Sequence, residues 1–409
     1  MRKRIALVDW NWVGHHPTFF NYFILAMEEL GMEVLALCPN PDEAEALARQ
    51  TRRSTGDNAP QSGRTHFEKI RITEQRFPHL RPRRLAAIDW AIRHFRGIEN
   101  QALAWTPLSG GRVDAIFHAC VYDRDFEWMQ GARPFLRIPW TGLYLHALSY
   151  RMPGAFRPGT RRKPFPERIF GGQLCRSLGI LDEGIVSEVS RHLGKPVVAL
   201  PDLADGRPAE TGDECLLGGC LKDFAAGRPI VGLFGHLQKS KGLLTFLEAA
   251  RLPGASGVCF ALAGDVLWPE DADEAAAIRN ALAACPNLWT HLERIPTEPA
   301  LNDLMGACDV LAAAYTDFPH SSGIQAKAAV LGKPLIVSGG YLMAERAKRF
   351  RMGEIVPQQD AGALLDAVVR IARDPAGWAD ASKPLWREYL QEHSFERLKT
   401  RLADLLAPF

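Results

Sequence analysis

The sequence has little net charge and no long apolar run near its start, and both absences exclude classes of protein. Lysine and arginine number 49 and aspartate and glutamate 47 in 409 residues, which leaves a formal net charge of +2. Such a balance does not produce the broad positive field of a general nucleic-acid binder. The first apolar run, residues 5–8, stops at Asp9 and is too short for a signal peptide or a membrane span. We therefore expect a cytoplasmic protein with no nucleic-acid partner.

Cysteine is also scarce for a chain of this length. Eight cysteines occur, at positions 38, 120, 175, 215, 220, 259, 285 and 308, and none of them forms a CxxC pair. A disulfide scaffold or a structural zinc site needs closely spaced cysteines, so we expect neither. The pattern is typical of free thiols in a reducing compartment.

The sequence does contain a repeated alternation of short apolar runs and helical patterns. The run 5–8 is followed by a helical pattern that starts at Thr18 and by a second run at 33–38, which predicts a βαβ unit. Further strands are expected at 114–118, 179–182 and 196–200, and then at 230–234, 258–263, 288–291, 310–314 and 335–338. The alternation predicts an α/β fold with two Rossmann-like, doubly wound parallel-sheet domains facing a cleft.

A change in composition marks the expected domain boundary. Residues 203–228 are rich first in Asp, Gly, Pro and Glu and then in small residues. We predict an N-terminal domain over 1–205, a linker over 206–228, a C-terminal domain over 229–390 and an amphipathic helix over 391–409 that can cross back to the N-terminal domain.

Two basic stretches interrupt the alternation. Residues 76–96 carry six arginines, and two interpretations stay open for them. The stretch is either a helix that makes peripheral contact with an anionic membrane, or a helix packed on the sheet. Its apolar stripe would consist of Leu85, Ile88, Ile92 and Phe95, with Trp90 beside them. The second stretch, 151–168, is a Pro- and Gly-rich loop that could hold an acidic acceptor.

Ligands of open parallel sheets bind beyond the carboxyl ends of the strands, so the loops there are the candidate sites. Gly14, His15 and His16 lie between the first strand and the first helix, where a glycine admits a ligand close to the backbone. Two adjacent histidines without nearby carboxylates do not make a metal site, so no metal is expected. His118 is predicted to end a strand and face the top of the sheet; the alternative is a core histidine.

Two loops of the second half have the chemistry of an anion site. Gly235, His236 and Lys241 follow the strand at 230–234, and their cations would face a diphosphate; the alternative is a solvated loop. Ser321–Gly323 directly precede a helix that runs to Leu331. The free amides and positive end of that helix favour an anion, although Ser321 could serve only as an N-cap.

Together these segments resemble the retaining glycosyltransferases of the GT-B fold, of the group-one or family-four type. No single segment is specific for this family, but the order and spacing of all of them, along nearly the whole chain, are specific for it. The segments are Gly14-His15-His16, Phe117-His118, the phrase at 142–146, 233–235 with Lys241-Gly242, 262–264, 307–309, 321–334, and Ala344-Glu345 ahead of Gly353.

The resemblance implies transfer of a sugar from a nucleotide-sugar donor, held by the C-terminal domain, to a glycan or lipid-linked acceptor held by the N-terminal domain. It implies no metal and no cofactor, and retention by attack from the face of the leaving phosphate. His118, Lys241 and Gly14 would be the catalytic positions. The donor-binding positions would be His15, Gly235, His236, Lys241, Ser321, Ser322, Gly323, Lys327 and Glu345.

The chain departs from the family pattern at two acidic positions. The family has two glutamates eight positions apart, where this chain has Pro319 and Lys327. Three interpretations stay open. The donor is unusual, or Glu345 takes over the lost contacts, or the chain is a catalytically inactive GT-B-like protein that binds a nucleotide or a glycan.

Overall fold

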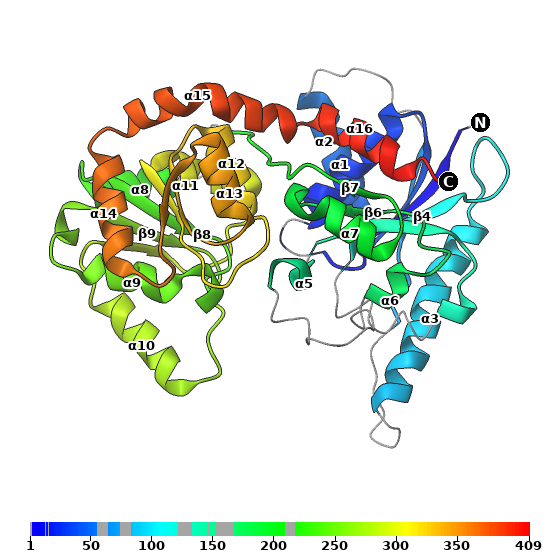
Figure 1. Ribbon diagram of the computed structural model, residues 1–409, viewed down its shortest axis with the longest axis horizontal. Coiled ribbons are helices and arrows are strands. Elements are labelled where there is room, and N and C mark those ends of the chain that lie inside the picture. Colours follow the sequence, from blue (N-terminus) through cyan, green and yellow to red (C-terminus); the bar gives the residue numbers. More distant parts are fainter. Residues whose placement is uncertain are drawn as a thin grey trace. The chain divides into compact units, whose positions relative to one another are not determined.

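The computed structural model describes residues 2–12, 14, 16–54, 64–73, 83–121, 133–145, 147–152, 167–208 and 217–409 of the chain. The chain divides into two compact units. The first comprises Met1–Pro201 and Ser394–Phe409, and the second comprises Asp202–His393. In each unit a β-sheet is covered by helices (Figure 1).

The first unit is built on a parallel sheet of seven strands in the order β3-β2-β1-β4-β5-β6-β7. Its strands are β1 Arg4–Val8, β2 Glu33–Cys38, β3 Thr65–Lys69, β4 Ala115–Val121, β5 Trp140–Tyr144, β6 Leu178–Ile180 and β7 Val197–Ala199. Its helices are α1 His16–Glu29, α2 Pro41–Ser54, α3 Arg83–Ala104, η1 Arg133–Phe135, α5 Leu148–Arg151, α6 Glu167–Phe170, η3 Glu183–Ile185, α7 Val186–Leu193 and α16 Phe395–Leu406. Central strands such as β1 and β2 are buried along almost their whole length, because helices cover both faces of a parallel sheet.

The second unit is built on a parallel sheet of six strands in the order β10-β9-β8-β11-β12-β13. Its strands are β8 Ile230–Phe234, β9 Cys259–Ala263, β10 Leu288–His291, β11 Val310–Ala313, β12 Leu335–Ser338 and β13 Gly353–Val356. Its helices are α8 Leu217–Ala225, η4 Lys239–Lys241, α9 Leu243–Arg251, η5 Ala255–Gly257, α10 Ala272–Ala283, α11 Glu298–Ala307, α12 Gly323–Leu331, α13 Leu342–Phe350, α14 Ala361–Ala372 and α15 Pro375–Glu392. The predicted α/β class with two parallel sheets is therefore confirmed.

The chain passes between the units twice, after Pro201 and after His393. The last helix, α16, packs on α1 and β7 of the first unit and buries four leucines. Its end is also tied down by polar contacts, because Ser177 Oγ donates to the Leu405 carbonyl at 2.6 Å and Lys3 Nζ donates to the Leu406 carbonyl. The described part of the predicted linker, 206–208 and 217–228, belongs to the second unit in this division and contains α8.

The basic helix α3 packs on the sheet of the first unit. Phe95 of the predicted apolar stripe and Trp90 beside it are buried in the core, with exposures of 2% and 6%. Trp90 Nε1 also donates to the Thr73 carbonyl at 2.8 Å. These contacts support the second interpretation of this segment, a helix packed on the sheet. Within the described part of the chain, no helix combines the length and the hydropathy needed to cross a membrane.

Candidate functional site

A glycine allows the loop after β8 to lie close against the end of β11. Gly242 has a φ of 73°, and a Cβ at this position would lie 2.3 Å from the carbonyl oxygen of Ala314. Only glycine tolerates both this conformation and this approach. The backbone amide of Thr316 donates to the Ser240 carbonyl at 2.9 Å. These contacts place Lys241 beside the loop that leads from β11 to α12.

The ammonium group of Lys241 lies against two aromatic rings, Tyr315 and Phe318, which pack edge to face on each other with their centres 5.0 Å apart. Its Nζ is 4.1 Å from the centre of the Tyr315 ring and 4.0 Å from the centre of the Phe318 ring. A cation is attracted to such ring faces, but the rings carry no opposing charge. No carboxylate of the described chain pairs with this ammonium. Burial lowers the pKa of Lys241 to about 7, and no charged neighbour contributes to the shift.

Tyr315 links Lys241 to the N-terminus of α12. The Tyr315 hydroxyl lies 3.4 Å from Ser322 Oγ, and burial raises the pKa of Tyr315 to about 12, so the phenol is neutral. Ser322 is the N-cap residue of α12, but its side chain makes no capping hydrogen bond. The first turn of a helix has backbone amides without intrahelical partners and a positive dipole end. Lys241 and the start of α12 therefore form one electropositive region.

Other predicted donor residues lie at the same edge of the second sheet. Gly235 and His236 follow β8, Ser321 precedes α12 and Gly323 is its first residue, and Glu345 lies in the first turn of α13 after β12. Strands β8, β11 and β12 are neighbours in the sheet, so their carboxyl ends bring these residues to one edge. His236 is exposed, and its Nδ1 lies 3.9 Å from Asp265 Oδ2.

Lys327 has a different setting from the one predicted. Its Nζ lies 2.6 Å from Glu298 Oε2, 2.6 Å from Asn302 Oδ1 and 2.9 Å from the Asp205 carbonyl. The ammonium donates hydrogen bonds to the Asn302 and Asp205 oxygens and forms an ion pair with Glu298. Lys327 therefore joins α12 to α11 and to the start of the second unit, and its geometry does not support the predicted contact with a donor.

The prediction that His118 ends a strand and faces the top of the sheet is wrong. Strand β4 continues past it to Val121, because the run after His118 stays buried. The ring is 2% exposed and lies 5.7 Å from the Trp10 ring and 5.6 Å from the Trp140 ring, centre to centre. Burial lowers the pKa of His118 to about 3, so the ring is neutral. The alternative given above, a core histidine, describes this position.

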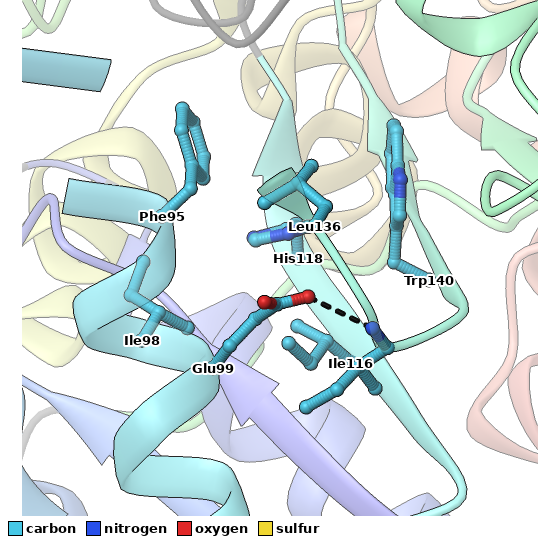
Figure 2. A pocket seen from close by; sticks show the side chains of 8 residues that line it. Phe95, Ile98, Glu99, Ile116, His118, Leu136 and Trp140 are labelled. Atoms are coloured by element: carbon cyan, nitrogen blue, oxygen red, sulfur yellow. Dashed lines mark hydrogen bonds between the residues drawn. The ribbon is translucent and has the colours of Figure 1, made fainter. Parts of the chain in front are cut away.

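A small cavity lies beside His118, between α3 and the sheet. Figure 2 shows the carboxylate of Glu99 beside His118, with Phe95 and Trp140 also lining the cavity. Glu99 Oε1 accepts hydrogen bonds from the amides of Arg137 at 2.7 Å and Ile138 at 2.8 Å. The cavity leaves about 10 Å³ for the centre of a water molecule, which is roughly enough for one water molecule. The cavity is too small for a sugar or a nucleotide.

The loop after β1 contains a buried aspartate–histidine pair that the sequence analysis missed. His16 Nδ1 lies 2.8 Å from Asp9 Oδ2, and Asp9 Oδ1 accepts from the Asn11 amide at 2.9 Å. Burial raises the pKa of Asp9, while the bond to His16 opposes that shift. An aspartate at a strand end followed by a histidine at a helix start was the signal in the sequence. Gly14 has a φ of 61° and is exposed, whereas His15 lies outside the described residues.

Cys120 joins this pair, so three groups with metal-ligand chemistry lie within 4.8 Å of one another. The geometry fits hydrogen bonding better than metal binding. Two ligands of a tetrahedral zinc ion are about 3.3 Å apart, whereas Asp9 and His16 approach to 2.8 Å. Burial also raises the pKa of the Cys120 thiol well above its ordinary value, which favours the protonated sulfur.

Comparison with known proteins gives the fold. Neither a protein-family model nor a curated protein sequence matches the chain. Among solved structures, Anabaena HepE in complex with UDP and glucose has a TM-score of 0.65 at 15% identity over 100% of both chains. Sucrose-phosphate synthase of Thermosynechococcus elongatus has a TM-score of 0.65 at 16% identity, covering 100% of this chain and 99% of its own.

A third similar structure is α,α-trehalose 6-phosphate synthase of Burkholderia multivorans, which has a TM-score of 0.64 at 12% identity over 100% of this chain and 99% of the synthase. Identities this low establish architecture and leave the activity to be argued from the site. The two parallel sheets and these similarities together show that the chain has the GT-B fold.

Proposed function

We propose that this protein is a glycosyltransferase that moves a sugar from a nucleotide-sugar donor to a glycan or lipid-linked acceptor. The observation that carries the proposal is the ammonium of Lys241, which pairs with no carboxylate among the described residues and lies beside the start of α12. Such a region suits the diphosphate of a nucleotide sugar. The similarity to HepE, which was solved with UDP and with UDP-glucose, supports this choice of ligand.

In the proposed reaction, the bond between the anomeric carbon and the diphosphate oxygen breaks, and a bond to the acceptor oxygen forms. Negative charge develops on the diphosphate oxygen of the broken bond as the nucleoside diphosphate leaves, and this oxygen takes the proton that the acceptor hydroxyl loses. Lys241 and the amides at the start of α12 would stabilise that charge, as preorganised donors do in many enzymes. With these groups in place we expect no need for a metal. Retention of the anomeric configuration is part of the same proposal.

A second candidate is a catalytically inactive protein that binds a nucleotide or a glycan. Two observations favour it. Pro319 and Lys327 replace two acidic residues of the resembling family, and Lys327 is committed to Glu298 and Asn302. Binding and turnover must therefore be measured separately.

The test uses the full chain and a panel of UDP, GDP and ADP in calorimetry, followed by nucleotide release from the corresponding nucleotide sugars. We expect one nucleotide to bind and Lys241→Ala to weaken it about 10- to 100-fold, because a hydrogen bond to a charged group contributes about 1.5–3 kcal/mol. Lys239→Ala is the matched control, since Lys239 lies in the same loop but pairs with Glu274.

Each outcome decides between the candidates. Binding that depends on Lys241, together with turnover, supports the transferase. Binding that depends on Lys241 without nucleotide release for any acceptor supports the inactive binding protein. If no nucleotide binds, or if Lys241→Ala binds as tightly as the original chain, the transferase and the inactive nucleotide-binding protein both fail, and only an inactive glycan-binding protein is left.

A further inference from the structure

We propose that the diphosphate of the donor binds together with a proton, which is taken up by the amine of Lys241. This inference rests on the proposed function, because it concerns the same site. It adds a property that the activity alone does not require: the site is charged by its ligand rather than before the ligand arrives.

The geometry around the amine is the first ground. Aromatic faces at 4.0 and 4.1 Å take the place of water around Lys241 Nζ. Ring faces attract a cation by about 0.5–2 kcal/mol, far less than full hydration or a carboxylate provides. The charged form of the amine is therefore the costly form in the empty site. Consistent with this, burial alone lowers the pKa of Lys241 to about 7.

The charged groups on the neighbouring elements do not compensate this cost. On the same loop, Lys239 lies 3.2 Å from Glu274 Oε1, and His236 is next to Asp265. Asp317 and His320 belong to the loop after β11, and Asp317 is exposed with its amide bonded to Gln358.

Tyr315 and the first turn of α12 also provide no negative charge near the ammonium. Tyr315 is neutral, since its pKa is raised to about 12. The first turn of α12 has no acidic residue, and its positive end disfavours a second cation.

A bound diphosphate shifts the equilibrium of Lys241 from the neutral amine to the ammonium form. Its negative charge beside the amine favours the ammonium form and raises the pKa of Lys241. Below about pH 7 the amine already holds its proton, so binding takes up none. Above that value binding takes up nearly one proton, and the dissociation constant rises up to about tenfold per pH unit until the pKa of the bound state is reached.

The experiment is calorimetry of the nucleotide that binds, in Tris and in HEPES, whose ionisation heats differ. The difference in measured heat gives the number of protons taken up. For the full chain we expect that number to rise from near zero at about pH 6 to about one at about pH 8.5. Lys241→Arg keeps a permanent positive charge at this position, so we expect it to bind with no uptake at about pH 8.5.

His236→Gln separates the other titratable group of the same loop. We expect this variant to keep the uptake at about pH 8.5, because histidines and the phosphate of the nucleotide have finished titrating there. If Lys241→Arg does not bind, the pH profile of the original chain decides. A proton number that falls back to zero above about pH 8 belongs to a histidine or to phosphate and overturns the inference.

Failure of the inference and failure of the proposed function are distinguishable. Binding without proton uptake at about pH 8.5, or equal uptake by Lys241→Arg, overturns the inference and leaves the donor site intact. Absence of binding for UDP, GDP and ADP overturns the donor site itself.

Discussion

Lys241 and Lys327 lie in the same unit, and each has lost much of its contact with water, but their surroundings are opposite. Lys327 is buried against three oxygens from Glu298, Asn302 and Asp205. Lys241 lies against two aromatic rings, and no carboxylate of the described chain pairs with it. The first arrangement is complete without a ligand. In the second, the charged form of the amine has no opposing charge until an anion binds, and this difference separates a structural lysine from a binding one.

The largest change in stability should come from replacing Lys327, whose contacts are complete without a ligand. Lys327→Met should lower the free energy of unfolding by about 2–4 kcal/mol, because Glu298 and Asn302 lose a partner that is mostly buried. Denaturant unfolding measures this, with the exposed Lys348→Ala as a control expected within about 0.5 kcal/mol of the original chain. A stable Lys327→Met that no longer binds nucleotide would invert the assignment of the two lysines.

The opposite pattern is expected at the uncompensated lysine. Lys241→Met retains an apolar chain against Tyr315 and Phe318, so the free energy of unfolding without ligand should change by less than about 1 kcal/mol or rise. Nucleotide affinity should nevertheless fall about 10- to 100-fold. Thermal unfolding with and without the nucleotide measures both quantities. A marked loss of stability without ligand would show that the amine has a structural partner.

His118 sharpens the comparison, because it is buried yet neutral. Its folded-state pKa is lowered to about 3, so the unfolded chain binds the extra proton once the pH falls below the ordinary histidine value. Each pH unit between about 6.5 and 3 should then cost about 1.4 kcal/mol of stability for this residue. His118→Leu should remove that part of the acid dependence, measured by unfolding at several pH values. His94, whose pKa is lowered to about 4, contributes a separate part that the variant retains.

The smallest effect is expected at Glu99. Glu99→Gln retains an oxygen that can accept from the amides of Arg137 and Ile138, and its amide can occupy the small cavity. Stability should therefore stay within about 1 kcal/mol of the original chain. A larger loss in denaturant unfolding would mean that the second carboxylate oxygen needs its negative charge.

Elements that the sequence could predict are those whose pattern is local. The strands β8 and β10 match the expected ranges, and α16 lies within the helix expected over 391–409, because buried parallel strands are continuous apolar runs and α16 has a regular amphipathic period. Strand β3 was missed because its edge position allows the polar sequence THFEK. Strand β13 is short and contains Gly353, and β5 follows a proline and contains Gly142, so neither has the expected pattern.

In the candidate site, too, the sequence predicts features that depend on local pattern and misses features that depend on packing. Lys241 and Ser322 could be proposed because a loop after a strand and a helix start are readable from local sequence. The commitment of Lys327 to Glu298 and Asn302 could not, because it depends on how α11 packs against α12. The pair of Asp9 and His16 depends on the turn between β1 and α1, which the sequence leaves undefined. His118 was misplaced because one polar residue inside an apolar run looks like its end.

The position of α16 has a consequence for how the protein is made. The first unit needs Ser394–Phe409 to cover Ser177 and the face of α1, whereas the second unit is one uninterrupted segment. During synthesis the second unit can therefore finish folding while the first still exposes apolar surface. A ribosome that stalls shortly before α16 would release a chain whose later half is native and whose earlier half is open to chaperones and proteases.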